Sequence, residues 1–377
     1  MSAKKVTTRP SLLLIGGFLG AGKSSLTRAL VKEAKKAGKR CALVTNDQGE
    51  GLVDTEMGRE TGEMINEITG GCFCCRADAL VGVLRTLERD ERPDFYLAEP
   101  VGSCTDLVAT VMRPLQDVYR FPVRMAPMAV VVDAVRFRDD FLENRNRKKF
   151  SKGVRYIWLK QLEEAEIVVL NKIDLLGEGE SELLGEKLVE DWPKKRILLV
   201  SVRTGRGIKT LFQMLCNTDA NLKGEGVEVD YPLYGRGEAA LGWYNATLTL
   251  QSGPWSIDPN RFLLELAHAV QTDLEMGGAE IAHFKISLQR ANEDKTKGRQ
   301  GIAVAQAVRN GFPAELSQRM KGPVSGGTLL INLRAECAPS RLSLIVERHL
   351  KGLPVTWEAK AAFRPSMPKP LHRITAA

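Results

Sequence analysis

Residues 11–25 read SLLLIGGFLGAGKSS and join an apolar run to a glycine-rich one. The run from Ser11 to Gly16 is typical of a buried strand, and Ser24 to Ala37, followed by Gly38, has the periodicity of a helix. Between them, Gly17 to Ser24 matches G-x-x-x-x-G-K-[ST] at every position. Glycines in such a loop let backbone N–H groups approach phosphates at the N-terminus of the helix. The stretch therefore predicts a nucleotide-binding α/β domain.

The polar residues of this loop are expected to have different roles in binding the nucleotide. Lys23 is expected to reach the β- and γ-phosphates, and the Ser24 hydroxyl to bind Mg²⁺. A glycine-rich turn could match this sequence pattern by chance, but the strand and the helix expected on either side argue against that alternative. The residues expected to contact the nucleotide here are Gly17, Gly20, Gly22, Lys23, Ser24 and Ser25.

Alternating strand and helix patterns continue through the first two thirds of the chain. This rhythm is typical of a mostly parallel sheet with helices on its faces, as in P-loop NTPases. The further strands are expected at 41–45, 95–98, 129–133, 167–170 and 197–201, and the helices at 77–89, 158–165 and 207–215.

A polar stretch without sustained periodicity, residues 221–242, is interpreted as a linker. It divides the chain into a P-loop domain, residues 1–220, and a smaller α+β domain, residues 243–377. In the second domain the patterns follow a ferredoxin-like βαββαβ plan. The strands are expected at 243–251, 282–289, 301–307, 327–334 and 355–361, and the helices at 259–274 and 340–351.

A second signal concerns the base of the nucleotide. Asn171-Lys172-Ile173-Asp174 follows an apolar strand. The Asp174 carboxylate can accept hydrogen bonds from N1 and N2 of guanine, whereas adenine offers no such pair of donors. Ser201 begins SVRTGRGI, which resembles the guanine-contacting loop of many GTPases. Each motif alone would also fit a helix cap or a turn, but in this order after the phosphate loop they favour guanine.

A third group of residues is expected near the γ-phosphate. Glu99 ends an expected strand and Gly102 follows three residues later, as in the D-x-x-G step of GTPases with Glu in place of Asp. Glu99 is a candidate to hold Mg²⁺ through water, and Lys23, Glu99 and Gly102 are the candidate catalytic residues. Asp47 and Asp54 are candidates for a nucleotide-sensing loop, and Asp47 is also a candidate metal ligand. Plain solvation is the alternative for both acids.

Three thiols lie within four residues in the segment Gly70-Gly-Cys72-Phe-Cys74-Cys75-Arg76. Cys72 and Cys74 point to the same side if the chain is extended. Three soft ligands suit Zn²⁺ or another borderline-soft cation and leave a fourth coordination position open. The alternative is that these are small buried side chains. The residues interpreted as isolated packing cysteines are Cys41, Cys104, Cys216 and Cys337.

Length and charge limit the class of protein. The 377 residues provide chain for two domains, and 44% hydrophobic and 27% charged residues are typical of a folded protein. No apolar run approaches the roughly 18 to 20 residues of a membrane-spanning helix. The net charge of +8 does not indicate nucleic-acid binding, since no RNA or DNA module accompanies it. Because grouped thiols suit the reducing cytosol, we expect a cytoplasmic protein that engages neither nucleic acid nor membrane.

The loop GFLGAGKS, the segment GCFCC, the E-x-x-G step and N-K-x-D, in this order, resemble the CobW-type metallochaperone GTPases, relatives of the UreG and HypB GTPases. The resemblance covers residues 11 to about 215. It implies a SIMIBI-class GTPase that binds GTP, Mg²⁺ and zinc, cobalt or nickel, with hydrolysis coupled to metal release. It also implies a client metalloprotein or cofactor-insertion enzyme that meets the second domain, and, by analogy alone, a homodimer.

The same resemblance assigns roles to single residues. It implies phosphate and Mg²⁺ contacts for Gly17, Gly22, Lys23 and Ser24, metal ligation for Cys72, Cys74 and Cys75, γ-phosphate sensing for Glu99 and Gly102, and guanine binding for Asn171, Lys172 and Asp174.

Two departures from the family pattern concern the chemistry. Asn46-Asp47 replaces Asn-Glu, which shortens the acid by one methylene. Glu99-Pro100-Val101-Gly102 replaces Glu-Thr-Thr-Gly and removes two hydroxyls and one backbone N–H, so slow hydrolysis is expected. The leading hypothesis is a GTP-hydrolysing chaperone that carries zinc or cobalt. The alternatives are a regulatory or assembly GTPase that carries no metal, and a P-loop kinase, which has no need of Asp174.

Overall fold

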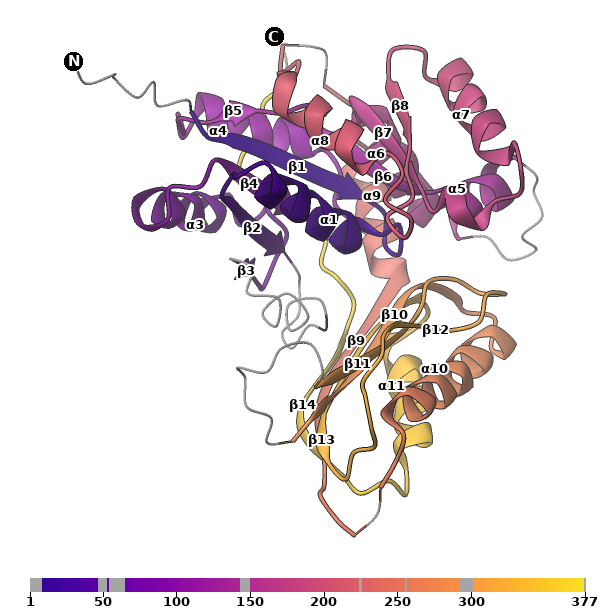
Figure 1. Cartoon of the computed structure of the whole chain (residues 1–377). Helices are drawn as coiled ribbons and strands as arrows, with labels where there is room; N and C mark the ends of the chain where they lie inside the picture. The colour runs from indigo at the N-terminus through magenta and orange to yellow at the C-terminus, as the bar shows by residue number, and fades with distance from the viewer. Residues whose placement is uncertain are drawn as a thin grey trace.

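The chain forms two β-sheets, each with helices packed on it (Figure 1). The structure is a computed structural model and describes residues 9–46, 53, 65–142, 150–223, 226–254, 256–291 and 301–375. The first sheet has the order β3-β2-β4-β1-β6-β7-β8, with β5 beside β1, and its described pairings are parallel. Its strands are β1 (Ser11–Gly17), β2 (Cys41–Asn46), β3 (Ile65–Ile68), β4 (Phe95–Glu99), β5 (Arg124–Met125), β6 (Ala129–Asp133), β7 (Ile167–Asn171) and β8 (Arg196–Leu199).

Alternate residues of β1 enter two different hydrophobic cores. The helices of this part are α1 (Lys23–Lys36), α3 (Ala77–Asp90), η1 (Val108–Met112), α4 (Arg113–Asp117), α5 (Ala134–Phe137), η2 (Arg138–Leu142), α6 (Lys152–Glu164), η3 (Ile173–Leu175), α7 (Glu180–Asp191) and α8 (Ile208–Asn217). Leu12 and Leu14 belong to the core with α3 and α6. Leu13 and Ile15 belong to the core with α1 and α8. An uninterrupted apolar run is needed here because both faces of the strand are covered.

The carboxyl ends of the parallel strands meet at one edge of the first sheet. β1 leads into the phosphate loop and α1, β4 ends at Glu99, and β7 ends at Asn171. Ligands of open parallel sheets bind at this edge. The topology therefore brings together residues that lie as many as 152 positions apart, as the bond between Lys172 and Gly20 shows.

The second sheet is antiparallel, in the order β12-β11-β10-β13-β9-β14. Its strands are β9 (Leu241–Leu250), β10 (Glu280–Arg290), β11 (Ile302–Ala307), β12 (Glu315–Gln318), β13 (Gly327–Glu336) and β14 (Val355–Phe363). Helices α10 (Pro259–Met276) and α11 (Pro339–Leu350) pack against it and against each other. The predicted fold class, a P-loop domain with a mostly parallel sheet followed by an α+β domain, is confirmed. The βαββαβ elements are β9, α10, β10, β13, α11 and β14, and β11 and β12 extend one edge.

The segment interpreted as a linker contains a helix, α9 (Tyr231–Ala240). Asp230 caps it, since its carboxylate accepts a hydrogen bond from the backbone N–H of Leu233 at 2.9 Å. The helix packs against α6 at two glycines, and a Cβ on Gly237 would lie 2.4 Å from the Gly153 carbonyl oxygen. Glycines that permit this approach also weaken the helical sequence pattern. The division of the chain at residues 221–242 stays a prediction.

The chain returns to the first sheet after β14, as its yellow end shows in Figure 1. We call residues 369–374 the C-terminal strap. Its Leu371 N–H donates to the Cys74 carbonyl at 3.0 Å, and its Ile374 N–H donates to the Ala109 carbonyl at 2.9 Å. The Arg373 guanidinium pairs with Asp106 at 2.6 Å. These bonds hold the strap against the part of the chain that carries the cysteine cluster.

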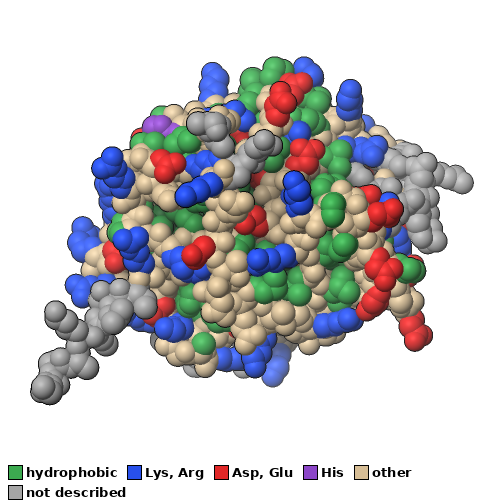
Figure 2. All heavy atoms as spheres, turned by 90° about the horizontal axis from the view of Figure 1, so that it is seen from above, with side chains coloured by type: hydrophobic (Ala, Val, Ile, Leu, Met, Phe, Trp, Pro, Cys, Tyr) green, Lys and Arg blue, Asp and Glu red, His purple; other side chains and the backbone are tan. Residues whose placement is uncertain are grey.

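Figure 2 shows one face, on which Lys and Arg side chains are spread among acidic and hydrophobic ones rather than gathered in a single patch. Within the described ranges, every helix is too short or too polar to cross a lipid bilayer.

Candidate nucleotide and metal sites

A cavity of about 530 Å³ lies between the carboxyl edge of the first sheet and the second sheet. Pockets of this size are typical of small-ligand sites. Most residues predicted to contact a nucleotide line it. They are Gly20, Gly22, Lys23, Ser24, Ser25, Glu99, Gly102, Asn171, Lys172 and Asp174.

Two glycines of the phosphate loop occupy positions that no larger residue fits. Gly17 has φ +130°, and a Cβ there would lie 2.3 Å from the Val131 carbonyl oxygen. Gly22 has φ +97°, and a Cβ there would lie 2.5 Å from Asn171 Nδ2. Both conformations are strained for residues with a side chain. Gly17 therefore shapes the loop from behind the cavity, and Gly22 lies where α1 begins.

Ser24 and Glu99 meet at the floor of the cavity. The Ser24 hydroxyl donates to Glu99 Oε1 at 2.7 Å, and the Thr27 hydroxyl donates to Glu99 Oε2 at 3.1 Å. A Cβ on Gly102 would lie 2.9 Å from Lys23 Nζ, so the two candidate catalytic positions are adjacent. A hydroxyl and a carboxylate are oxygen ligands of the kind that Mg²⁺ prefers, so these residues fit that ion. Asp47 and Asp54 lie outside the described residues.

The residues of N-K-x-D divide into two structural groups. Asn171 Nδ2 donates to the Ala21 carbonyl at 2.9 Å, and Lys172 Nζ donates to the Gly20 carbonyl at 2.7 Å. These two side chains thus brace the phosphate loop. Asp174 instead lines the cavity, and its Oδ1 accepts from the Ser201 hydroxyl at 2.6 Å. Ser201 therefore orients the acid predicted to read the base.

The second sheet supplies a wall of the cavity that sequence reasoning missed. Its lining residues include Trp243, His283, Lys285, Asn332 and Arg334. The Arg334 guanidinium is buried, donates to Asn245 Oδ1 at 2.7 Å and lies 3.7 Å from the centre of the Trp243 ring. These residues belong to ordinary strand patterns, so no local signal distinguishes them. Only the placement of the second sheet beside the first makes them part of the site.

Buried ion pairs join the two walls of the cavity. Arg136 of α5 donates to the carbonyls of Ile281 and Val308 at 3.0 and 2.9 Å. Arg309 pairs with Asp139 at 2.5 Å, and both side chains are less than one tenth exposed. Separating the two sheets would leave these buried charges without partners, which is strongly unfavourable. The contacts therefore hold the two sheets in this arrangement.

The three predicted metal-binding cysteines form a compact group. Among the described residues, Cys72, Cys74 and Cys75 place their Sγ atoms within 4.8 Å of one another. The separations are 2.7 Å for Cys72 and Cys74, 3.2 Å for Cys72 and Cys75, and 3.7 Å for Cys74 and Cys75. Asn46, at the end of β2, holds this turn because its Oδ1 accepts from the Phe73 N–H at 2.8 Å. Asn46 thus stabilises the turn that carries the three thiols.

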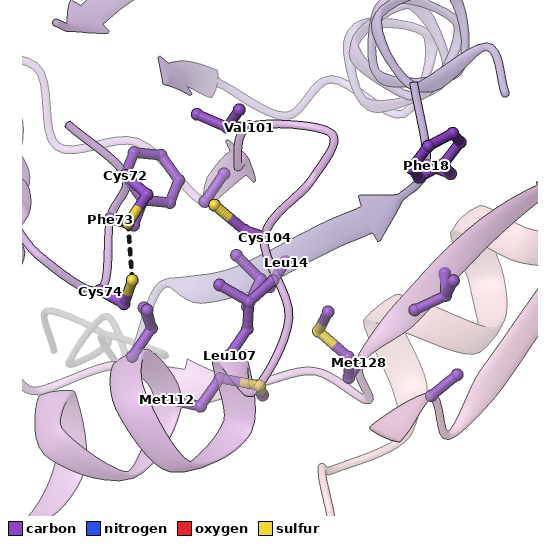
Figure 3. Close-up of a cluster of buried hydrophobic side chains, with 14 of the residues drawn as sticks. Leu14, Phe18, Cys72, Phe73, Cys74, Val101, Cys104, Leu107, Met112 and Met128 are labelled. Atoms are coloured by element: carbon purple, nitrogen blue, oxygen red, sulfur yellow. Dashed lines mark hydrogen bonds between the residues drawn. The ribbon is translucent and has the colours of Figure 1, made fainter. Parts of the chain in front are cut away.

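Cys104, interpreted as an isolated packing residue, is buried in the same hydrophobic core as Cys72 and Cys74. In Figure 3 its sulfur faces the side on which Cys72 lies, and the hydrogen bond drawn there joins Cys72 and Cys74. Hydrogen bonds from Cys104, Cys74 and Cys75 hold the pKa of Cys72 far below its usual range. The pKa values of Cys74 and Cys104 are raised, first because each shares a hydrogen bond with Cys72 and also because of burial. Cys41, Cys216 and Cys337 pack against the cores as predicted.

A buried acid lies close to the thiols. Glu238 of α9 is 1% exposed, and among the described residues its Oε2 has no hydrogen-bond partner. Burial and then the negative charge of Cys72 raise its pKa to about 8. The three sulfur donors of Cys72, Cys74 and Cys75 suit a divalent, borderline-soft cation. The donor set therefore fits zinc or cobalt.

We expect Glu164→Gln to remove part of a loss of stability that occurs as the pH rises from about 4.5 to 8. Burial, and then Asp106, raise the pKa of Glu164 to about 8, and its Oε2 accepts from the Leu107 N–H at 2.7 Å. Between about pH 4.5 and 8 the folded state keeps a proton that the unfolded state loses, so stability falls as pH rises. The difference is on the order of 5 kcal/mol.

Melting temperatures of the metal-free protein at pH 5 and pH 8.5 test this expectation. The variant should be more stable than the original at pH 8.5 and nearly equal at pH 5, because glutamine keeps an acceptor for Leu107 without the charge. Glu163→Gln, on the half-exposed neighbouring position, is the control and should leave the pH dependence unchanged. A parallel fall of both proteins with pH would contradict the assigned ionisation.

Comparison with known proteins identifies the N-terminal part. Residues 11–198 match the family CobW/HypB/UreG, nucleotide-binding domain. The zinc chaperone CobW of a Sinorhizobium species is 31% identical over 193 residues, 43% of this chain and 51% of that protein. The zinc chaperone YeiR of Escherichia coli K12 is 38% identical over 90 residues, 24% of this chain and 27% of that protein.

Among solved structures, HypB from Helicobacter pylori in complex with nickel aligns at 17% identity with a TM-score of 0.40, over 55% of this chain and 86% of that one. The chain spans about half the length of CobW and about a quarter of YeiR, the curated relatives it matches. The N-terminal domain of this chain, residues 11–198, belongs to the CobW/HypB/UreG family of nucleotide-binding domains.

Proposed function

We propose that this protein is a GTP-dependent metallochaperone that binds zinc at its cysteine cluster and delivers it to a client metalloprotein or cofactor pathway. One observation carries the proposal. The segment from Glu99 to Cys104 lines the nucleotide cavity at one end and contacts the cysteine cluster at the other. A movement of this six-residue segment on loss of the γ-phosphate would therefore also move the residues that pack beside the thiols.

The nucleotide part of the proposal assigns roles to the cavity residues. Lys23 and the loop N–H groups would bind the phosphates, and Asp174, oriented by Ser201, would accept hydrogen bonds from guanine. Ser24 and Glu99 would hold Mg²⁺, which neutralises phosphate charge during hydrolysis. Gly102 beside Lys23 would sense the γ-phosphate, and slow GTP hydrolysis follows from Pro100 and Val101.

The metal part rests on the donor set and on the relatives. Thiolates accept zinc, cobalt and nickel, so the ligands alone do not choose among them. Two matched relatives carry the name zinc chaperone, which favours zinc. Buried sulfur and the carboxylate of Glu238 would compensate the charge of the cation. We place the protein in the reducing cytosol, where the thiols stay available.

Metal titration in defined nucleotide states tests the proposal. The reduced full-length protein is titrated with Co²⁺ and, by competition with a chelator, with Zn²⁺, in the presence of Mg²⁺·GTP, Mg²⁺·GDP or no nucleotide. Cobalt–thiolate charge-transfer absorption reports the ligands. We expect thiolate coordination and an affinity that is at least about tenfold higher with GTP than with GDP, a typical coupling between two sites.

Mg²⁺·ATP is the matched nucleotide control. It should leave the metal affinity at the nucleotide-free value, because adenine lacks the donor pair for Asp174. Absence of thiolate absorption in every state, together with GTP turnover, would reject the chaperone and indicate a regulatory GTPase that carries no metal. Turnover of ATP with a small-molecule acceptor would instead indicate a kinase.

A further inference from the structure

We propose that the second sheet binds the phosphates of the nucleotide through Lys285 and Arg334, across the cavity from the phosphate loop. The inference rests on the GTP-binding part of the proposed function and requires no metal at the cysteines. The two cations come from neighbouring strands, β10 and β13, and both line the nucleotide cavity. A bound nucleotide would then contact both sheets and hold them together.

The phosphate loop lies directly against the second sheet. A Cβ on Gly20 would lie 2.8 Å from the Ala282 carbonyl oxygen and 3.3 Å from the Val308 Cβ. Ala282 belongs to β10, the strand that carries Lys285. The Lys285 side chain lines the same cavity as Gly20 and Lys23. The two walls of the cavity therefore meet at the place expected for the phosphates.

The strand register places polar residues of the second sheet in two adjacent rows. In the first row, Arg334 lies opposite His283 on one side and Trp243 on the other. In the second row, Asn332 lies opposite Lys285. Alternate residues of a strand point to the same face, so the two rows share one face of the sheet. All five side chains line the cavity, which makes this face one of its walls.

The next row on this face is apolar and belongs to a separate core. Val304 and Leu330 lie in it and form a buried cluster with Val53 and Ile302. The Val53 N–H donates to Asn332 Oδ1 at 2.9 Å, at the border between the polar and apolar rows. Neither Val304 nor Leu330 lines the cavity. The polar rows thus coincide with the part of the face that a ligand can reach.

The order of the strands matches the order of the groups along a nucleotide. At the base end, Arg203 Nε lies 3.7 Å from Asp174 Oδ2, and Arg203 Nη2 pairs with Glu315 of β12 at 2.8 Å. β10 and β13 follow β12 by two and three strands, which is about 10 Å and about 14 Å. The phosphates extend from the base toward the phosphate loop, which contacts β10. Lys285 and Arg334 therefore face the phosphate end of the nucleotide.

Burial strengthens the interaction of the two cations with an anion. Lys285 is 8% exposed and Arg334 is 2% exposed. Asn245 Oδ1 and the Trp243 ring orient the Arg334 guanidinium, and these two contacts do not neutralise its charge. Opposite charges attract more strongly away from water, and hydrogen bonds between charged groups are among the strongest in proteins. The wall is therefore suited to a polyphosphate.

Lys285→Gln and Arg334→Gln are each expected to lower the affinity for GTP by about tenfold to 100-fold, because each removes one charge-assisted hydrogen bond. The affinity for guanosine, which carries no phosphate, should stay within about twofold of the original. Competition with a fluorescent guanine nucleotide, in the full-length protein with Mg²⁺, measures both affinities. A residue that only supports the fold would change both affinities by the same factor.

Two further variants serve as controls. Lys285→Arg keeps the positive charge and should bind GTP within a few fold of the original affinity. Lys360 belongs to β14 of the same sheet, is 44% exposed and pairs with Glu347 at 3.0 Å. Lys360→Gln removes one positive charge outside the cavity and should bind GTP with the affinity of the original protein.

Hydrogen exchange of the original protein provides a test that requires no folded variant. Backbone amides of β10 and β13 should exchange at least about tenfold more slowly with saturating Mg²⁺·GTP than with saturating guanosine, because the phosphates would hold these strands against the first sheet. Helix α11 packs in the core of the second sheet and is the internal reference, with a smaller change expected. Equal exchange of β10 and β13 with both ligands would overturn the inference.

The outcomes separate this inference from the proposed function. If the original protein binds no GTP, the proposed function fails first. If GTP binds and both glutamine variants keep the original affinity, the second sheet lines the cavity without binding phosphates, and the chaperone proposal stands. If the variants lose GTP and guanosine equally, Lys285 and Arg334 support the fold and the phosphate contact is overturned.

Discussion

Asp174→Asn is expected to lower the affinity for GTP by at least about 100-fold and to transfer the preference to xanthosine triphosphate. The carboxylate can accept from both N1 and N2 of guanine, whereas an asparagine offers one acceptor and directs an NH₂ group at the guanine NH₂. Xanthine carries a carbonyl oxygen at that position and can accept from the asparagine. Equilibrium binding of fluorescent GTP and XTP analogues measures both affinities.

Asp219→Asn is the control for the loss of one negative charge. Asp219 is 80% exposed, pairs with Arg124 at 3.1 Å and is absent from the cavity lining. This variant should bind GTP with the affinity of the original protein and should gain no affinity for XTP. Equal loss of GTP and XTP binding in Asp174→Asn, with normal thermal stability, would show that Asp174 supports the loop rather than reads the base.

Replacing Cys72, Cys74 and Cys75 together by serine is expected to lower zinc affinity by at least about 10⁴-fold. Serine hydroxyls stay protonated at neutral pH and are poor ligands for zinc, while cysteine binds as thiolate. Cys72 is expected to contribute most, since its Sγ lies closest to the other two, at 2.7 Å from Cys74 and 3.2 Å from Cys75. Isothermal titration or chelator competition with Zn²⁺ measures the change.

A second triple variant provides the control. Cys41, Cys216 and Cys337 replaced by serine make the same number of chemical changes outside the cluster, at half-buried positions. Zinc affinity should be unchanged in this protein. If both triple variants lose zinc equally, the metal binds elsewhere or the loss reflects unfolding, which melting temperatures would distinguish. GTP affinity of the first variant should remain within a few fold of the original.

The nucleotide half of the site could be predicted because its signals are local in the sequence. The phosphate loop, from Gly17 to Ser24, has its own strand and helix on either side, so its geometry follows from adjacent residues. Glu99 and Asp174 could be placed near it because parallel strands end at one edge of a sheet. Their expected roles need no knowledge of contacts far along the chain.

The remaining parts of the site depend on long-range packing. Cys104 packs in the same buried core as Cys72, although 32 positions separate the two residues. No local spacing in the sequence predicts this contact. Lys285 and Arg334 look like inward-facing residues of separate strands, and only the second sheet carries them to the cavity. Helix α9 escaped prediction because the glycines that let it approach α6 are poor helix formers.

The C-terminal strap follows every other part of the metal site in the order of synthesis. The thiols and α9 exist before Leu371 and Lys369, whose N–H groups bond to the Cys74 carbonyl and to the Cys75 sulfur at 3.0 and 3.3 Å. During translation, the cluster is therefore complete in its ligands but uncovered on the side of Cys75. A cation that enters at this stage meets an open face, and one that enters later meets a face that the strap partly covers.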